Sequence, residues 1–292
     1  MSDSATVVSQ IEGTYRASDG WALHTYAWSS NNLGTRSPVV VIMHGYAEHV
    51  GRYREFAEYL VRSGNRVCGF DARGHGKSPG QRGHIPIFDR YVEDLHGFTQ
   101  SIRREDPDRP IVMLGHSNGG LSALRVVQTR RHAADGLILS CPLIALQRRH
   151  TVVPVWLASI LASFAGRLPL PNGIDGRELT HDAAIREVQE HDPLNHGLTT
   201  PRWYVTVHGA MKLALASLDA VRLPALVLEA DSDPIVVPQA VSRLYDGLAS
   251  PDKELIVARN SYHEILNEVG RAETYRQIAA WLAARWKESR AA

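Results

Sequence analysis

The sequence predicts an α/β fold, in which helices flank a mostly parallel central sheet and one helical segment is inserted as a cap. Short apolar runs of β type alternate with segments of helical periodicity, as in sheets covered by helices on both faces. The alternation stops once, from roughly residue 143 to residue 223. The 292 residues are enough for one sizeable core.

Before this interruption, strands are expected where β-branched and other apolar residues run together. The helices between them carry apolar residues three and four positions apart, as in the set Phe56, Tyr59 and Leu60 and the set Tyr91, Leu95 and Phe98. The expected strands lie at 39–43, 67–70, 111–114 and 136–140, and the expected helices at 53–63, 88–103 and from 121 to about 131.

After the interruption, strands are expected at 225–228 and 254–257 and helices at 240–248 and 271–287. The intervening residues are irregular, partly helical and contain several prolines. We therefore expect one α/β core, formed by residues 1–143 and 224–292, and a cap or lid formed by residues 144–223.

Composition narrows the possible functions. The 32 basic and 31 acidic residues give a net charge of +1, so no electrostatic grip on nucleic acid is expected. Residues 1–4 lack the basic and apolar regions of a signal peptide, and the uncharged apolar stretch 151–166 is short for a membrane span. We expect a soluble cytoplasmic protein in which Cys68 and Cys141 are buried free thiols.

The most informative motif is Gly-His-Ser-Asn-Gly at 115–119, which a second glycine, Gly120, follows. It lies between the strand expected at 111–114 and a helical pattern. A G-x-S-x-G sequence in this position is typical of the nucleophile elbow, a strained turn that lifts a serine hydroxyl above the sheet. Flanking glycines let the backbone turn without a Cβ clash. The motif predicts that Ser117 attacks an acyl carbon.

A serine hydroxyl needs a base to take its proton and an acid to orient that base. After an elbow of this kind the acid follows a later strand and the base follows the last one. Asp233 is the preferred acid, Asp231 is its rival, and Glu229 is expected to end the strand. His263 is the expected base, 30 positions after Asp233.

The oxyanion needs preorganised N–H donors. The backbone N–H of Asn118, directly after the nucleophile, is one expected donor. The other is the backbone N–H of Tyr46, in the His-Gly-Tyr turn 44–46 after the first buried strand. A plain tight turn is the alternative interpretation of His44 and Gly45.

These residues bring the chain close to a known family. It resembles the monoacylglycerol lipases and lysophospholipase-like serine hydrolases of the α/β-hydrolase superfamily. Residues 44–53 (HGYAEHVGRY) are similar to the family's HGxxEHxxRY motif, and residues 71–78 (DARGHGKS) to its DxRGHGxS loop. Residues 80–84 (GQRGH) resemble the GxRGH continuation, and residues 192–194 the DPL motif of the cap. The elbow resembles GHSMGG, except that Asn118 replaces methionine.

The resemblance implies a helical cap over the active site, esters of long acyl chains as substrates, and no metal or cofactor. It also implies the catalytic triad Ser117, Asp233 and His263. Asn118 contributes a backbone group, so its departure from methionine should alter the pocket wall and leave activity in place. Glu48, His49 and Arg73 are interpreted as scaffold residues that fix the loops beside the oxyanion hole.

The apolar stretch 151–164 in the cap has two interpretations. It is either a helix buried on the core or a lid whose inner face binds the acyl chain and whose outer face meets lipid. The substrate-binding residues expected on it are Val155, Trp156 and Ile160. Basic residues at 148–150 beside this apolar helix suit transient, peripheral contact with a membrane surface.

We therefore expect a serine hydrolase that cleaves carboxylic esters of fatty acids, with monoacylglycerol as the first candidate substrate. Lysophospholipase and general carboxylesterase activity would use the same residues and stay open, as does acyl transfer to an alcohol. Peptidase activity is less favoured, because the sequence offers no recognisable site for a substrate amine. From a different class, a non-catalytic lipid-binding scaffold is the alternative, and the complete triad argues against it.

Overall fold

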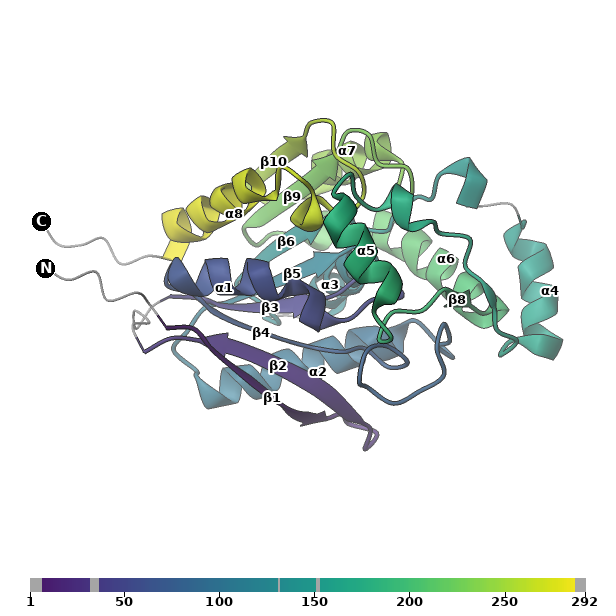
Figure 1. Ribbon diagram of the computed structural model, residues 1–292, viewed down its shortest axis with the longest axis horizontal. Helices are drawn as coiled ribbons and strands as arrows, with labels where there is room; N and C mark the ends of the chain where they lie inside the picture. Colours follow the sequence, from purple (N-terminus) through teal and green to yellow (C-terminus); the bar gives the residue numbers. More distant parts are fainter. Residues whose placement is uncertain (1–6, 32–36, 131, 151–152, 287–292) are drawn as a thin grey trace, which may run out of the picture.

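A mostly parallel sheet forms the centre of the molecule (Figure 1). The structure is a computed structural model that describes residues 7–31, 37–130, 132–150 and 153–286. Within these residues, the sheet has eight strands in the order β1-β2-β4-β3-β5-β6-β9-β10. The pairs β1–β2 and β2–β4 are antiparallel, and the other neighbours are parallel. The expected α/β fold is confirmed.

The strands and helices expected from residue 39 onward are present, with ends that differ by a few residues. The strands of the sheet are β1 (Ser9–Arg16), β2 (Ala22–Ser29), β3 (Val39–Met43), β4 (Arg66–Phe70), β5 (Ile111–His116), β6 (Gly136–Ser140), β9 (Ala225–Ala230) and β10 (Lys253–Ala258). The helices of the core are α1 (Arg54–Arg62), α2 (Asp89–Glu105), α3 (Asn118–Thr129), α7 (Pro238–Gly247) and α8 (Arg271–Trp286). Residues 131 and 287, at the expected ends of two helices, lie outside the described residues.

The hairpin of β1 and β2 is an addition that the sequence analysis did not contain. Side chains of β1 are almost all exposed, and β2 has three buried side chains, Leu23, Tyr26 and Trp28, among exposed and partly exposed ones. Neither strand has a continuous apolar run, which was the signal used for the buried strands. The hairpin joins the sheet antiparallel to β4 and thereby forms one of its edges.

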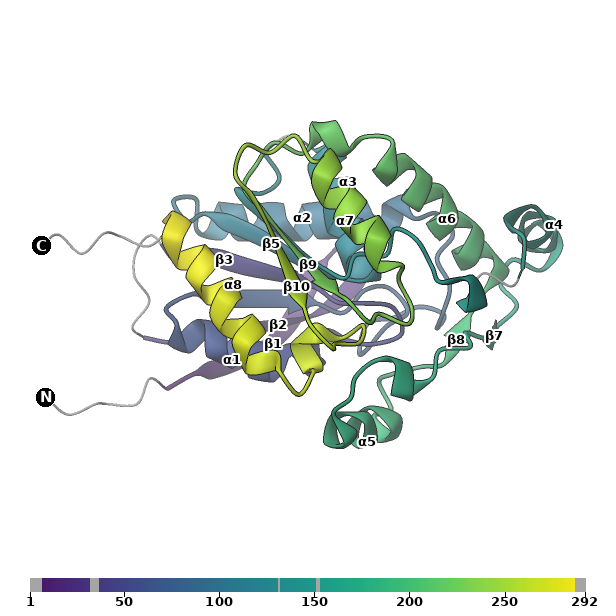
Figure 2. The ribbon, with the colours of Figure 1, turned by 90° about the horizontal axis from the view of Figure 1, so that it is seen from above.

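Strand periodicity divides the core into two layers. Along β3, Val39, Val41 and Met43 pack in the cluster that includes α2, α3 and α7, whereas Val40 and Ile42 pack in the cluster with α1 and α8. Successive side chains of a strand point to opposite faces, so a strand buried on both faces is apolar throughout. Figure 2 shows the sheet from above, with helices on either side.

The segment between β6 and β9 contains α4 (Val155–Ala165), α5 (Ala183–His191), α6 (Pro201–Leu215) and a small ribbon of β7 (Leu170–Pro171) and β8 (Leu198–Thr199). Helix α4 packs on α6, and α6 packs on α3 of the core. In both ribbon views α4 lies at one end of the molecule, away from α5 (Figures 1 and 2). Residues 151–152 of the expected apolar stretch lie outside the described residues.

No helix within the described ranges is long and apolar enough to cross a membrane.

Close packing explains the glycines of the elbow. A Cβ atom on Gly119 would collide with the carbonyl oxygens of Met43 and His44, and one on Gly115 would collide with the carbonyl of Gly119. The start of α3 therefore lies directly against the end of β3. This contact brings the turn after β3, which holds Tyr46, beside Ser117.

We expect Gly119→Ala to lower the free energy of unfolding by about 1–3 kcal/mol or more, because backbone atoms must move to admit the methyl group. Gly209→Ala is the matched control, since nothing lies within 4 Å of a Cβ at Gly209 in α6. This control should be neutral or stabilising by up to about 1 kcal/mol. Chemical denaturation of both variants measures the difference, and equal stabilities would refute the packing argument.

Candidate active site

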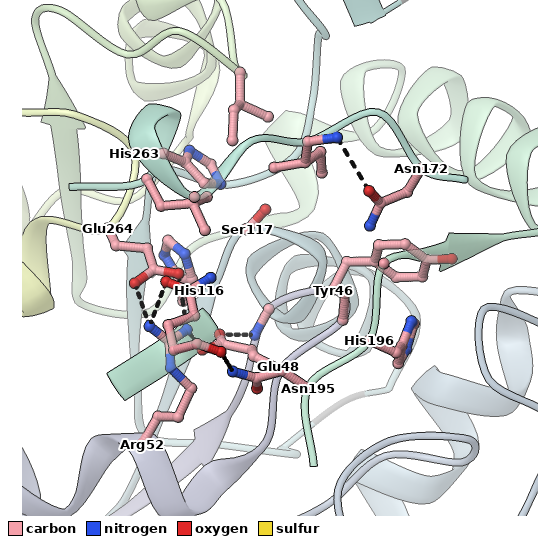
Figure 3. A pocket seen from close by; sticks show the side chains of 18 of the residues that line it. Tyr46, Glu48, Arg52, His116, Ser117, Asn172, Asn195, His196, His263 and Glu264 are labelled. Atoms are coloured by element: carbon pink, nitrogen blue, oxygen red, sulfur yellow. Dashed lines mark hydrogen bonds and ion pairs between the residues drawn. The ribbon is translucent and has the colours of Figure 1, made fainter. Parts of the chain in front are cut away.

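Ser117 lies in a strained turn between β5 and α3. Its φ is 51° and its ψ −116°, a conformation that residues with a Cβ rarely adopt. Three backbone hydrogen bonds hold the turn. The N–H of Ser117 donates to the carbonyl of Ser140 at 2.9 Å, and its carbonyl accepts from Leu121 and Leu143 at 3.0 and 2.9 Å. The side chain opens into a pocket that His263 also lines (Figure 3).

His263 and Asp233 form a buried pair. His263 Nδ1 donates to Asp233 Oδ2 at 2.7 Å, while Asp233 Oδ1 accepts from the N–H groups of Ile235 and Val236 at 2.8 and 2.9 Å. With its proton on Nδ1, the imidazole presents Nε2 as an acceptor. The described residues contain no direct hydrogen bond between Ser117 and His263. Catalytic hydrogen bonds often tighten only when substrate binds.

The electrostatics of this pair suit a general base. Burial lowers the pKa of His263, but the charge and the hydrogen bond of Asp233, followed by the charges of Glu264 and Glu48, outweigh it and raise the pKa above 6.5. For Asp233, burial raises the pKa, yet His263 and the two backbone N–H groups bring it below its usual value. The carboxylate therefore stays ionised and stabilises the imidazolium.

The rival carboxylates do not reach His263. Asp231 accepts a hydrogen bond from the hydroxyl of Ser232 and lies 3.8 Å from Arg259 Nη1. Glu229, at the end region of β9, accepts from the Ser242 hydroxyl at 2.5 Å. Of these three acids, only Asp233 orients the imidazole.

Tyr46, in the loop after β3, lines the same pocket as Ser117, and Asn118 directly follows Ser117 as the first residue of α3. In the described residues, neither backbone N–H donates a hydrogen bond to another protein group, so both remain available to a ligand. Glu48 fixes the loop, since its Oε1 accepts from the Gly45 N–H at 2.6 Å and from the Tyr53 hydroxyl at 2.7 Å. These contacts agree with the expected scaffold role of Glu48.

Arg52 is a site residue that the sequence analysis did not single out. Its guanidinium donates to Glu48 at 2.6 Å, to both carboxylate oxygens of Glu264 at 2.8 and 2.6 Å, and to Gln189 of α5 at 3.2 Å (Figure 3). Burial raises the pKa of Glu48, but the positive charge of Arg52 dominates and brings that pKa to about 2. Arginine in the HGxxEHxxRY motif and an acid directly after His263 were the available signals.

His49 and Arg73, the other expected scaffold residues, also have carboxylate partners. His49 Nε2 donates to Asp192 of the inserted segment at 2.8 Å. Arg73 makes bidentate contacts with Asp94 of α2 and with Asp19. Each of these side chains connects a loop to another part of the chain and is turned toward its partner.

Two cavities meet near Asn172, which lines both. One, of about 300 Å³, contains Ser117 and His263 and is lined by charged side chains as well as by apolar ones such as Leu143, Leu146 and Ile235. The other, of about 680 Å³, is an open apolar groove formed mainly by α4 and the start of α6. Among the expected lid residues, Ile160 lines this groove, whereas Val155 and Trp156 do not, and Trp156 is 67% exposed.

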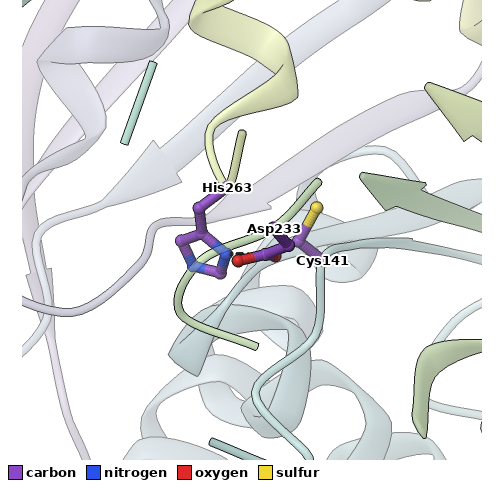
Figure 4. A group of neighbouring side chains, drawn as sticks. All are labelled: Cys141, Asp233 and His263. Atoms are coloured by element: carbon purple, nitrogen blue, oxygen red, sulfur yellow. Dashed lines mark hydrogen bonds and ion pairs between the residues drawn. The ribbon is translucent and has the colours of Figure 1, made fainter. Parts of the chain in front are cut away.

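Cys141, Asp233 and His263 place one potential ligand atom each within 4.8 Å of one another (Figure 4). This trio does not fit a metal centre. The nitrogen and oxygen atoms nearest each other already share the hydrogen bond between His263 and Asp233. Burial raises the pKa of the Cys141 thiol well above its usual value, so it stays protonated. Cys68 and Cys141 are both buried and free, as expected.

The fold and the elbow define the class as α/β-hydrolases, and comparisons with known proteins give the family. Residues 34–270 match the family model described as serine aminopeptidase, S33 (Hydrolase_4), and the chain belongs to this family. It is 31% identical to phospholipase YtpA of Bacillus subtilis over 83% of this chain and 94% of that protein. It is also 31% identical to the monoacylglycerol lipase of Mycolicibacterium smegmatis, over 84% and 87%.

Solved structures agree with this assignment. The crystal structure of Paleococcus ferrophilus monoacylglycerol lipase superposes with a TM-score of 0.78 at 31% identity and covers 90% of this chain and 98% of that one. A monoglyceride lipase from Saccharomyces cerevisiae, bound to a substrate analogue, gives a TM-score of 0.80 over 96% and 97% at 23% identity and therefore supports the fold.

Because the pKa of His263 is raised, we expect kcat/KM for a soluble ester to rise with pH along a limb whose apparent pKa lies above 6.5. Only the neutral imidazole accepts the serine proton. The raised pKa keeps the His263 side chain in its protonated, inactive form up to a higher pH. Asp233→Asn removes the charge that raises this pKa, so the limb should move to lower pH and kcat should fall about 10⁴-fold. A wild-type limb clearly below 6.5 would contradict this account.

Proposed function

We propose that the protein is a serine ester hydrolase whose substrates are monoacylglycerols, cleaved to a fatty acid and glycerol. The observation that carries this proposal is that the pocket of Ser117 and a separate apolar groove share Asn172 in their linings. A long acyl chain fits the groove, and a small polar head group fits the pocket. The names of the relatives from Mycolicibacterium and Paleococcus point to the same substrate.

In the proposed mechanism His263 takes the proton of Ser117 as Oγ attacks the ester carbonyl. The backbone N–H groups of Tyr46 and Asn118 hold the oxyanion of the tetrahedral intermediate. His263 then protonates the departing glycerol, which leaves an acyl-enzyme on Ser117. Water, activated by His263, releases the fatty acid, while Asp233 orients the imidazole and stabilises its cation.

The charged side chains that line the pocket of Ser117 favour an uncharged head group. Its lining includes the carboxylates of Glu48, Glu190, Asp192 and Glu264, against the single guanidinium of Arg52. Burial, as the main cause, lowers the pKa values of His116 and His196 to about 4, so neither adds positive charge at neutral pH. A phosphate would meet net negative charge here, whereas an uncharged glycerol would not be repelled.

Lysophospholipase activity is therefore the second candidate, and the Bacillus relative carries the name phospholipase. Peptidase activity on a free amine would need an unengaged carboxylate at the pocket. Glu48 and Glu264 are paired with Arg52, and Asp192 with His49, so Glu190 is the one of these four carboxylates that has no ion pair within the described residues. A non-catalytic lipid-binding scaffold has no need for the hydrogen bond between Asp233 and His263.

We also propose that residues 144–223 act as a cap and that α4 touches lipid surfaces. Several apolar side chains of α4 face solvent, with Phe164 89% exposed and Trp156 67% exposed. Leu157, Ile160 and Leu161 are 40–51% exposed and line the groove as well. An exposed apolar face of this kind suits an interfacial helix, and it would place the mouth of the acyl groove against the lipid phase.

Wild-type protein should release fatty acid from a medium-chain monoacylglycerol, and Ser117→Ala should reduce turnover by about 10⁶-fold. Because the pocket is acidic, the wild type should hydrolyse monoacylglycerol with a clearly higher kcat/KM than a lysophospholipid of the same acyl chain. Titration of released fatty acid measures both. Preference for the lysophospholipid would favour the second candidate, and turnover that persists in Ser117→Ala would refute the mechanism.

Trp156→Ser should weaken binding to lipid vesicles about ten- to hundredfold, because burial of a large apolar side chain contributes about 1.5–3 kcal/mol. Co-sedimentation with phosphatidylcholine vesicles, with and without phosphatidylglycerol, measures this binding. Val269→Ser is the matched control, since Val269 is 69% exposed and lies outside the inserted segment. Equal losses in both variants, or none in Trp156→Ser, would contradict contact through α4.

A further inference from the structure

The side chain of Tyr46 leaves the loop after β3 and packs into the inserted segment. Its hydroxyl donates to the carbonyl of Leu198 in β8 at 2.8 Å. Its ring stacks on Trp203 with 3.7 Å between ring centroids and 29° between planes, and meets the edge of His196 at 5.6 Å. Figure 3 shows Tyr46 and His196 on the side of the pocket away from Arg52.

Neighbouring residues of the same loop contact the same part of the inserted segment. The carbonyl of Ala47, whose φ is 68°, accepts from the N–H of His196 at 3.0 Å. His49 donates to Asp192 at 2.8 Å. The loop 46–49 is therefore held from two sides. Glu48 ties it to the core, and its other three residues contact residues 192–203 of the inserted segment.

This part of the inserted segment has its own attachments to the core. Thr200, fully buried, donates from Oγ1 to the Gly83 carbonyl at 3.0 Å and caps α6 by accepting from the Trp203 N–H. Further along α6, the carbonyl of Ala214 accepts from Gln128 of α3 at 2.8 Å. Helix α3 begins at Asn118, the residue that supplies the second oxyanion donor in the proposed mechanism.

We propose that residues 192–203 position the oxyanion hole through the Tyr46 side chain, and that Tyr46 and Trp203 are positioning residues for ester hydrolysis. This inference rests on the proposed function, in which the Tyr46 N–H binds the oxyanion. The loop between β3 and the short helical turn at Val50–Tyr53 belongs to no helix or strand, so no regular backbone hydrogen bonding orients its N–H groups. Side-chain contacts therefore set their direction. Oxyanion donors must be preorganised, and a small misplacement costs catalysis.

The test separates oxyanion positioning from acyl-chain binding. It uses p-nitrophenyl acetate, whose acyl group is too short to reach the groove, and a short alkyl trifluoromethyl ketone. With the ketone, Ser117 Oγ adds to the carbonyl carbon, the serine proton passes to His263, and the carbonyl oxygen becomes an oxyanion in the hole. The variants are Tyr46→Phe, Trp203→Leu and the conservative Trp203→Phe.

We expect kcat for p-nitrophenyl acetate to fall about 3- to 10-fold in Tyr46→Phe and about 10- to 100-fold in Trp203→Leu, below the 10²–10³ for complete loss of a donor. KM should change little, and the dissociation constant of the ketone should rise by the same factors. Trp203→Phe keeps a stacking ring and should restore most of the loss. The double variant should lose less than the product of the single losses, because both act through one loop.

Tyr245→Phe is the matched control, since it also removes a tyrosine hydroxyl that donates to a backbone carbonyl, that of Lys253 at 3.4 Å. It should leave kcat and ketone affinity unchanged, and thermal melts confirm folding of every variant. Unchanged kcat and ketone affinity in folded Tyr46→Phe and Trp203→Leu would overturn the inference, as would a loss of kcat without loss of ketone affinity. A wild type inactive on monoacylglycerol would refute the proposed substrate, while the ketone still decides the positioning role.

Discussion

The buried guanidinium of Arg52 is the interaction on which the arrangement of the site depends. It joins Glu48, which holds the loop of the proposed oxyanion donor, to Glu264, which directly follows His263 in the chain. These loops come from opposite ends of the sequence. Removing one member of a buried ion pair costs about 3–5 kcal/mol, because the remaining charges lose their partner in a low dielectric. The loops of the proposed base and of the proposed oxyanion donor are therefore held by one shared group.

The sheet supplies the framework on which the loops joined by Arg52 are mounted. Ser117, Asp233 and His263 follow the strands β5, β9 and β10. These strands are parallel, so the three loops emerge together at the carboxyl ends of the strands. The strained turn at Ser117 is kept by hydrogen bonds to Ser140 and Leu143 and by a glycine contact that leaves no room for adjustment. Rigid strands fix the large distances, and buried polar side chains then set the orientation of each loop.

The sequence predicted the parts of the fold and site whose signal is local. Apolar runs indicate buried strands such as β3, and flanking glycines in a fixed pattern indicate Ser117. The hairpin of β1 and β2 has no such run. Arg52 and Trp203 depend on contacts across more than a hundred residues, with Glu264 and Tyr46 respectively, which no spacing rule contains. The acid assignment needed geometry too, since Asp231 and Asp233 are two positions apart.

The inserted segment makes directed polar contacts in one part and apolar contacts in another. This difference suits the two tasks proposed for it, which are positioning of Tyr46 and contact with lipid. The part around α5, β8 and the start of α6 is tied to the core by directed polar contacts, including those of Asp192, Thr200 and Leu198. Helix α4 instead packs on α6 and exposes apolar side chains. Apolar contacts are non-directional, so in the proposed lipid contact α4 would exchange water for lipid at low cost. The directed contacts would keep Tyr46 in place during that exchange, so that substrate entry would not disturb the proposed oxyanion hole.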